Sequence, residues 1–113
     1  MKIAFTTKGT DWNSEMDPRF GRTEFILVYD DEKDEFTSFD NHDIENEAHG
    51  AGPKTSQNLF EMGPEVLITG NGPGGNAATV LEKAGIKIYI GAGQMSVKEA
   101  FDAYKNSSLK KFL

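Results

Sequence analysis

The sequence contains no cysteine among its 113 residues, and this absence excludes several classes of site. Without thiolates the chain forms no disulfide, holds no cysteine-ligated zinc and cannot anchor an iron–sulfur cluster through its own sulfur atoms. Basic residues are also scarce, with 12 Lys and Arg against 18 Asp and Glu and a net charge of −6. Nucleic-acid binding needs a basic surface, so no nucleic-acid partner is expected.

Long apolar stretches are missing as well. The longest apolar runs have about five residues, whereas a membrane-spanning helix needs about 20. The first residues run directly into a polar loop and do not resemble a signal peptide. We therefore expect one domain over residues 1–113, with a cytoplasmic location and no membrane partner.

Five short segments have the composition of β-strands. Lys2–Thr7, Phe25–Tyr29 and Val66–Ile68 are continuously apolar, which is typical of strands covered on both faces. Glu35–Phe39 is weaker, and Ile86–Ile90 alternates apolar and polar residues, so both are expected at sheet edges.

Three segments have helical periodicity: Lys54–Met62, Asn76–Ala84 and Ser96–Lys105. The third opens with Ser96 and Glu99 at the spacing of a capping box. The resulting order β-β-β-α-β-α-β-α, with a tight turn after Asp30 and right-handed helical crossovers, predicts a three-layer α/β/α fold. The expected sheet has five strands in the order 3-2-1-4-5 with strand 2 antiparallel, as in ribonuclease-H-like proteins.

A ligand site is expected where the winding of this sheet reverses, beyond the carboxyl ends of strands one and four. The loop after strand four contains Gly70, Asn71, Gly72, Gly74 and Gly75 and leads into a helix. Helix amino termini attract anions, so the loop is either an anion site or a tight turn without a ligand.

The loop after strand one, from Lys8 to Arg22, contributes the positive charge. Arg19 and Arg22 are the only arginines, and their guanidinium groups suit oxyanions; the alternative is that they pair with surface carboxylates. Phe20, between them, is expected to be a core residue that anchors the loop. We expect residues 8–16 to be mobile, because Trp12 is nearly their only large apolar side chain.

Metal ligands and catalytic groups are sparse. His42 and His49 lie in one loop, a weak metal signature whose alternative is two exposed histidines; Met16 offers a soft thioether. Strands one and four carry no carboxylates for two-metal chemistry, and no nucleophile motif occurs. An enzyme is therefore not expected.

Several motifs together resemble the dinitrogenase iron–molybdenum cofactor biosynthesis family. They are the start Met1–Phe5, Asp17-Pro-Arg-Phe-Gly-Arg22, the Gly50-Ala-Gly52 turn, the loop Ile68–Gly75, and the strand Gly85–Gly91 followed by Ser96-x-x-Glu-Ala. The resemblance extends over essentially the whole chain. It implies a ribonuclease-H-like fold and a non-catalytic carrier of the iron–molybdenum cofactor or its iron–sulfur precursor, working with cofactor-assembly proteins.

The sequence departs from that family at one informative position, since several members have a histidine where Arg19 stands here. An anionic cluster would then be held by histidine, such as His42 and His49, by methionine, or by charge and backbone amides, for which Lys8, Arg19, Arg22 and the glycine loop are suitable. A related role in metal-cofactor assembly is equally compatible with the resemblance. Two other functions stay open: a small-molecule or phosphate-binding module at the same crevice, and a ligand-free interaction domain acting through the acidic segment 30–47.

Overall fold

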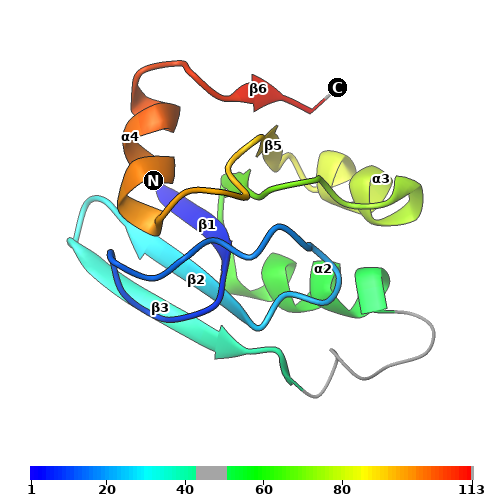
Figure 1. The fold of residues 1–113 in the computed structure, drawn as a ribbon. Coiled ribbons are helices and arrows are strands. Elements are labelled where there is room, and N and C mark those ends of the chain that lie inside the picture. Colours follow the sequence, from blue (N-terminus) through cyan, green and yellow to red (C-terminus); the bar gives the residue numbers. More distant parts are fainter. Residues whose placement is uncertain (43–50, 113) are drawn as a thin grey trace.

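The computed structural model describes residues 1–42 and 51–112, which form one mixed sheet and the helices that cover it (Figure 1). The strands are β1 (Lys2–Thr7), β2 (Phe25–Asp30), β3 (Glu35–Asp40), β4 (Val66–Ile68), β5 (Lys87–Ile90) and β6 (Lys110–Lys111). The helices are α2 (Ala51–Met62), α3 (Gly75–Lys83) and α4 (Val97–Lys105). No helix in this part of the chain is long and apolar enough to cross a membrane.

The sheet order is β3-β2-β1-β4-β5-β6, which confirms the predicted order of the first five strands. Strand β2 runs antiparallel to both β1 and β3, while β1, β4 and β5 are mutually parallel. Burial explains the arrangement, because the strands with apolar residues on both faces occupy the centre.

The prediction of five strands with β5 at an edge is wrong, because β6 pairs antiparallel with β5. The sixth strand consists of Lys110 and Lys111, both exposed, so it has no apolar pattern for a sequence to reveal. Tertiary contacts hold it instead. The Phe112 N–H donates to the Ile88 carbonyl at 2.8 Å, and the Phe112 ring packs against a buried apolar cluster.

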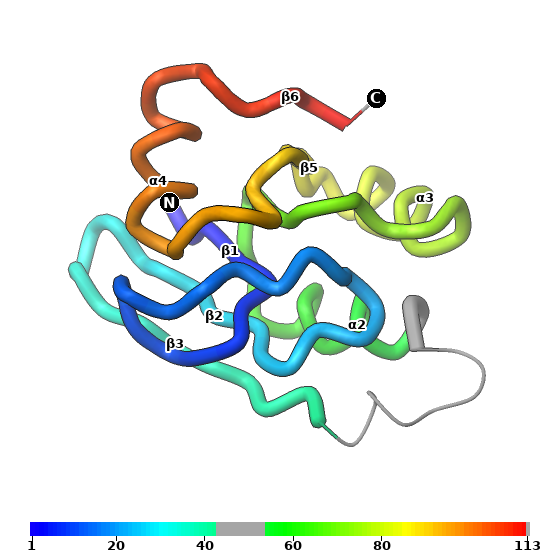
Figure 2. The backbone as a smooth tube through the Cα atoms, in the orientation of Figure 1, coloured from blue at the N-terminus to red at the C-terminus, as the bar shows by residue number. Residues whose placement is uncertain are grey.

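The two faces of the sheet are covered differently (Figures 1 and 2). Helices α2 and α3 pack together on one face, where Leu59 and Leu81 meet sheet residues such as Leu67. Helix α4 covers the other face, where Val97 and Ala100 join a second apolar cluster. This is the predicted three-layer α/β/α arrangement.

Helix boundaries differ slightly from those predicted. Helix α2 starts at Ala51 rather than Lys54, so residues 51–53 lie in its first turn, where a proline is tolerated. Helix α3 spans Gly75–Lys83, and α4 starts after Ser96, whose side chain forms the predicted capping box with Glu99.

The loop of residues 8–16 is docked on the α4 face, and its expected mobility stays a prediction. The Trp12 ring lies 4.8 Å from both Tyr29 and Phe36, measured between ring centroids. Met16, whose thioether the sequence offers as a soft ligand, is fully buried and donates its N–H to the Met95 carbonyl. The partly buried Trp12, the buried Met16 and several backbone hydrogen bonds therefore hold the loop in place.

Candidate anion site at the carboxyl ends of β1 and β4

The loops that follow β1 and β4 meet, as the predicted topology requires. The Asn71 N–H donates to the Pro18 carbonyl at 3.0 Å. A Cβ atom on Gly70 would lie 2.5 Å from the Pro18 Cα, a distance that only glycine permits. Gly70 and Asn71 are thus the joint between the two loops, and Gly70 is glycine because two backbones touch there.

Asp17 organises the loop after β1. Its carboxylate is fully buried and accepts hydrogen bonds from the Arg19 and Glu24 backbone N–H groups at 3.0 and 3.1 Å. The Arg19 guanidinium adds two more, from Nε to Oδ1 and from Nη2 to Oδ2, both at 3.0 Å. One side chain therefore bridges both ends of the segment 17–24.

The ionised form of Asp17 is favoured by these contacts. Burial by itself would raise the pKa of Asp17, but the hydrogen bonds from Arg19 and Glu24 outweigh it and hold the pKa below its usual value. Asp17 is consequently a carboxylate at neutral pH, and its charge is compensated by Arg19.

The two arginines have different surroundings. Arg19 pairs with a carboxylate, as one of the two sequence-based alternatives proposed, but its partner is the buried Asp17 rather than a surface acid. The Arg19 side chain is 43% exposed. Arg22 is half-buried. Phe20, between them, is 4% exposed and packs into the α2–α3 core, which confirms its predicted anchoring role.

A buried polar network supports the loop from beneath, and the sequence analysis missed it. The Thr6 and Thr69 hydroxyls lie 2.7 Å apart, joining the ends of β1 and β4, and Thr6 also donates to the Asp17 carbonyl. Asn41 donates to the Thr23 carbonyl and to the Thr55 hydroxyl. In the sequence, the only indication of this network is that threonines follow the apolar residues of β1 and β4.

The glycine loop divides into two parts. Gly72 has a φ of +87° and faces Phe112 and Ile90, so this glycine serves packing toward β6. Gly74 and Gly75 face open space, and Gly74 caps α3 without any side-chain hydrogen bond. The first-turn N–H groups of α3 are consequently accessible to an anion.

Lys8 lies in a separate cavity of about 340 Å³ that shares Pro18 with the junction of the loops. Its Nζ is 3.9 Å from the Glu15 carboxylate, and Met16 and Met95 line the same cavity. The structure therefore does not place Lys8 directly beside the open end of α3.

His42 is bracketed by two carboxylates. Its Nδ1 contacts the Asp40 carboxylate and its Nε2 lies 3.3 Å from Glu24 Oε1, and these contacts raise the pKa of His42. Within residues 1–42 and 51–112, no cluster of three or more His, Cys, Asp or Glu suits a metal ion. His49 lies outside the described residues, so the predicted histidine pair stays a prediction.

Taken together, this end of the sheet offers arginine side chains, accessible amides and no free thiol. That donor set favours an anion bound through charge and hydrogen bonds rather than through metal–sulfur bonds to the chain.

Comparison with known proteins identifies two relatives that match almost the whole chain. The orange protein of Desulfovibrio gigas, solved in its apo form, is 31% identical and superposes with a TM-score of 0.90, covering 98% of this chain and 92% of that one. A putative NifB protein from Thermotoga is 36% identical with a TM-score of 0.81, covering 97% and 91%. No curated protein matches the sequence.

The family model described as dinitrogenase iron-molybdenum cofactor matches residues 1–107, nearly the whole chain. Its extent agrees with the order of motifs from the first strand to the helix after β5. This chain belongs to the dinitrogenase iron–molybdenum cofactor family.

Proposed function

We propose that this protein is a non-catalytic carrier of an anionic metallocluster, of the iron–molybdenum cofactor or iron–sulfur precursor type. The observation that carries the proposal is the family match over residues 1–107. The full-length likeness to an orange protein whose structure is an apo form supports it. We further propose that the sheet, with β2 antiparallel among β3-β2-β1-β4-β5, is of the ribonuclease-H-like type.

The donor set determines how such cargo is held. Because the sequence has no cysteine, the cluster is bound by charge, by backbone amides and by neutral donors. Arg22 and the exposed part of Arg19 supply positive charge, and the first turn of α3 after Gly74 supplies N–H donors. Lys8 lines a neighbouring cavity and contributes at longer range.

The residues at this end of the sheet are better suited to delivering a cluster than to catalysis. The carboxyl ends of β1 and β4 present Thr6, Thr7 and Thr69, which are neither metal-binding acids nor activated nucleophiles. Asp17 is engaged by Arg19 and is not free to act as a base. Binding through charge and hydrogen bonds is also reversible, as transfer to a cofactor-assembly partner requires.

A second candidate is a module that binds a small oxyanion at the same place. The accessible amides after Gly74 favour it, since helix amino termini commonly bind phosphate. The two candidate functions differ in the anion that they require: a metallocluster is larger and softer than a small oxyanion such as phosphate.

The test is an anaerobic titration followed by visible absorbance and by backbone amide NMR shifts. The probes are tetrathiomolybdate, a synthetic [4Fe–4S] cluster with exchangeable thiol ligands, and inorganic phosphate. Saturable shifts at Arg22 and residues 74–77, accompanied by a new absorption band, are expected for a sulfur-containing anion. Saturation by phosphate alone would favour the second candidate, and no saturation by any probe would contradict both.

Arg22→Ala is the informative variant. Loss of a charge-assisted hydrogen bond should weaken binding by about 1.5–3 kcal/mol, roughly 10- to 150-fold, with little change in thermal stability. Lys87→Ala is the matched control, because it removes one positive charge from the opposite end of the parallel strands. Intact binding together with a melting temperature lowered by several degrees would make Arg22 structural and the site wrong.

A further inference from the structure

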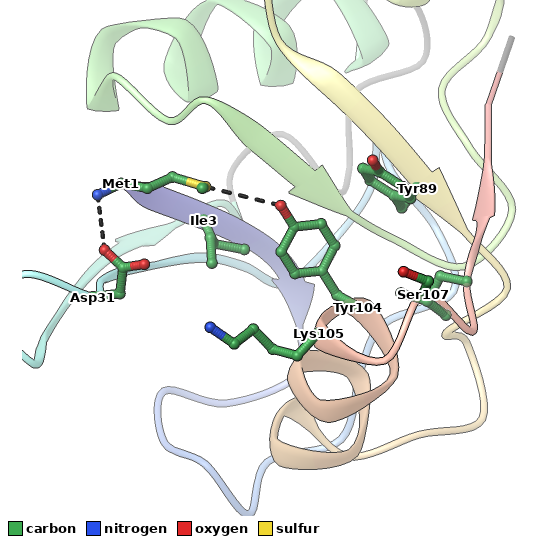
Figure 3. Close-up of a pocket in the computed structure, with 8 residues that line it drawn as sticks. Met1, Ile3, Asp31, Tyr89, Tyr104, Lys105 and Ser107 are labelled. Carbon is green, nitrogen blue, oxygen red and sulfur yellow. Dashed lines mark hydrogen bonds and ion pairs between the residues drawn. The ribbon is translucent and has the colours of Figure 1, made fainter.

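A cavity of about 540 Å³ opens on the α4 face of the sheet, near the amino end of β1 (Figure 3). It lies between Met1 and Ile3, the last turn of α4 and the segment 107–109. None of its lining residues belongs to the loops of the candidate anion site. Its volume is that of ordinary small-molecule pockets, so it is large enough for a second ligand.

The walls favour a flat, unsaturated ligand. The Tyr89 and Tyr104 rings lie 5.1 Å apart between centroids, at 72° to one another, and both border the cavity. Ile3 and Leu109 add aliphatic surface. Two perpendicular rings and two branched side chains complement a planar aromatic group, which gains edge-to-face contact and apolar burial together.

The polar groups at the rim favour a negative charge on that ligand. Lys105 is the one ammonium side chain that borders the cavity, and its Nζ rests 5.5 Å from the Phe101 ring centroid. Asp31, the one carboxylate there, already accepts from the terminal amine of Met1 at 2.8 Å. The positive charge of Lys105 is therefore the less compensated of the two.

Two hydroxyl groups border the cavity as well. Burial and, to a smaller extent, Tyr89 and the carboxylates of Asp31 and Glu65 raise the pKa of Tyr104. The Tyr104 hydroxyl donates to the Met1 sulfur at 3.9 Å, and Ser107 supplies another hydroxyl. The carbonyls of the last turn already accept from the helix cap: Ser108 donates to Ala103 at 2.8 Å and Ser107 to Tyr104 at 3.1 Å. These two carbonyls are therefore already hydrogen-bonded.

We propose that this cavity is a second binding site, for a small planar aromatic anion. The ring of the ligand packs against the Tyr89–Tyr104 pair, and the acidic group of the ligand binds Lys105. The site shares no residue with the proposed cluster site, so either proposal can fail without the other.

The test uses three indole probes that differ in charge: indole-3-acetate, indole and tryptamine. Binding to the full chain is measured by amide NMR shifts. We expect saturable shifts at Ile3, Tyr89 and Ser107, with indole-3-acetate binding about tenfold more tightly than indole, and tryptamine most weakly. Lys105→Met should remove the advantage of the acid and leave indole binding unchanged.

Lys83→Met, on α3 and across the sheet, is the matched control and should retain the full preference. Tyr104→Phe keeps the ring and tests the hydroxyl separately. Melting curves establish that each variant is folded. The proposal is overturned if no probe saturates, if tryptamine binds as tightly as the acid, or if shifts fall only at residues 17–22 and 70–75.

Discussion

The Asp17 side chain holds the loop after β1 together. It is fully buried, and four hydrogen bonds from Arg19 and Glu24 converge on its two oxygens. Its contribution is therefore local order: it shapes the turn that presents Arg19 and Arg22.

Asp17→Ala should lower the free energy of unfolding by about 2–3 kcal/mol, because two backbone N–H groups and a guanidinium lose their acceptor. Urea denaturation measures it. Asp102→Ala is the control, since Asp102 makes only an exposed i,i+4 pair with Lys98, and it should cost about 0.5 kcal/mol or less. Equal costs for the two variants would contradict the assigned role.

The same residue predicts a pH dependence. Because the pKa of Asp17 is lower in the folded chain than its usual value of 3.8, its contribution is complete above that usual value and declines as the pH falls toward the folded pKa. Stability of the natural chain should therefore drop on acidification below about pH 4 more steeply than that of Asp17→Ala.

His42 should titrate above its usual pKa of 6.5, because the Asp40 and Glu24 carboxylates stabilise the imidazolium. A raised pKa means that the stabilisation is present at low pH and is lost as the pH rises through the folded pKa. Imidazole NMR shifts measure the titration. Asp40→Asn should bring the pKa back toward 6.5, while Asp11→Asn, in another loop, should not; an unmoved pKa in Asp40→Asn would refute the assignment.

At the scale of elements, the joint between the loops after β1 and β4 depends on one missing Cβ. Gly70→Ala should destabilise the protein by about 1–3 kcal/mol, because the new methyl group would lie 2.5 Å from the Pro18 Cα and the backbones must separate. Thermal or urea unfolding measures it.

Gly75→Ala is the matched control for Gly70→Ala. It adds the same methyl group four residues after Asn71, where nothing lies within 4 Å, and should be neutral or stabilising by up to about 1 kcal/mol. A tolerated Gly70→Ala would show that the loops approach less closely than described.

The loop of residues 8–16 should behave as part of the folded core. Its backbone amide order parameters should equal those of β1, since Trp12 packs among Tyr29, Phe36 and Phe101. Trp12→Ala should cost about 2–4 kcal/mol and lower those order parameters.

Phe60→Ala is the aromatic control for Trp12→Ala, because 51% of Phe60 is exposed; it should cost well under 1 kcal/mol. Low order parameters in the unmodified loop would support the mobility expected from the sequence and contradict the docked loop.

At the scale of the whole molecule, the sheet separates two regions of different chemistry. The carboxyl ends of β1 and β4 present arginines and accessible amides, whereas the aromatic cavity lies on the α4 face near the amino end of β1. Strand β1 connects the two regions, because Ile3 near its amino end lines the cavity and Thr7 at its carboxyl end precedes the loop. The net charge of −6 makes local concentration of positive groups necessary for attracting any anion.

Apolar patterning by itself determined the sheet order of the first five strands and the layers. Continuous apolar runs such as Phe25–Tyr29 can be buried only at the centre, and the turn after Asp30 permits only an antiparallel neighbour. The meeting of the loops after β1 and β4 followed from that topology, as did the capping box at Ser96 and the burial of Phe20.

Only tertiary structure decided β6, the docking of residues 8–16 and the partner of Arg19. Each depends on contacts between residues distant in sequence or on the burial of a polar group: Phe112 with Ile88, Trp12 with Phe101, and Asp17 beneath its own loop. Local patterns record which residues prefer to be buried, but they do not record which partner satisfies a buried carboxylate or an exposed strand edge. Those partners are chosen by the packing of the completed fold.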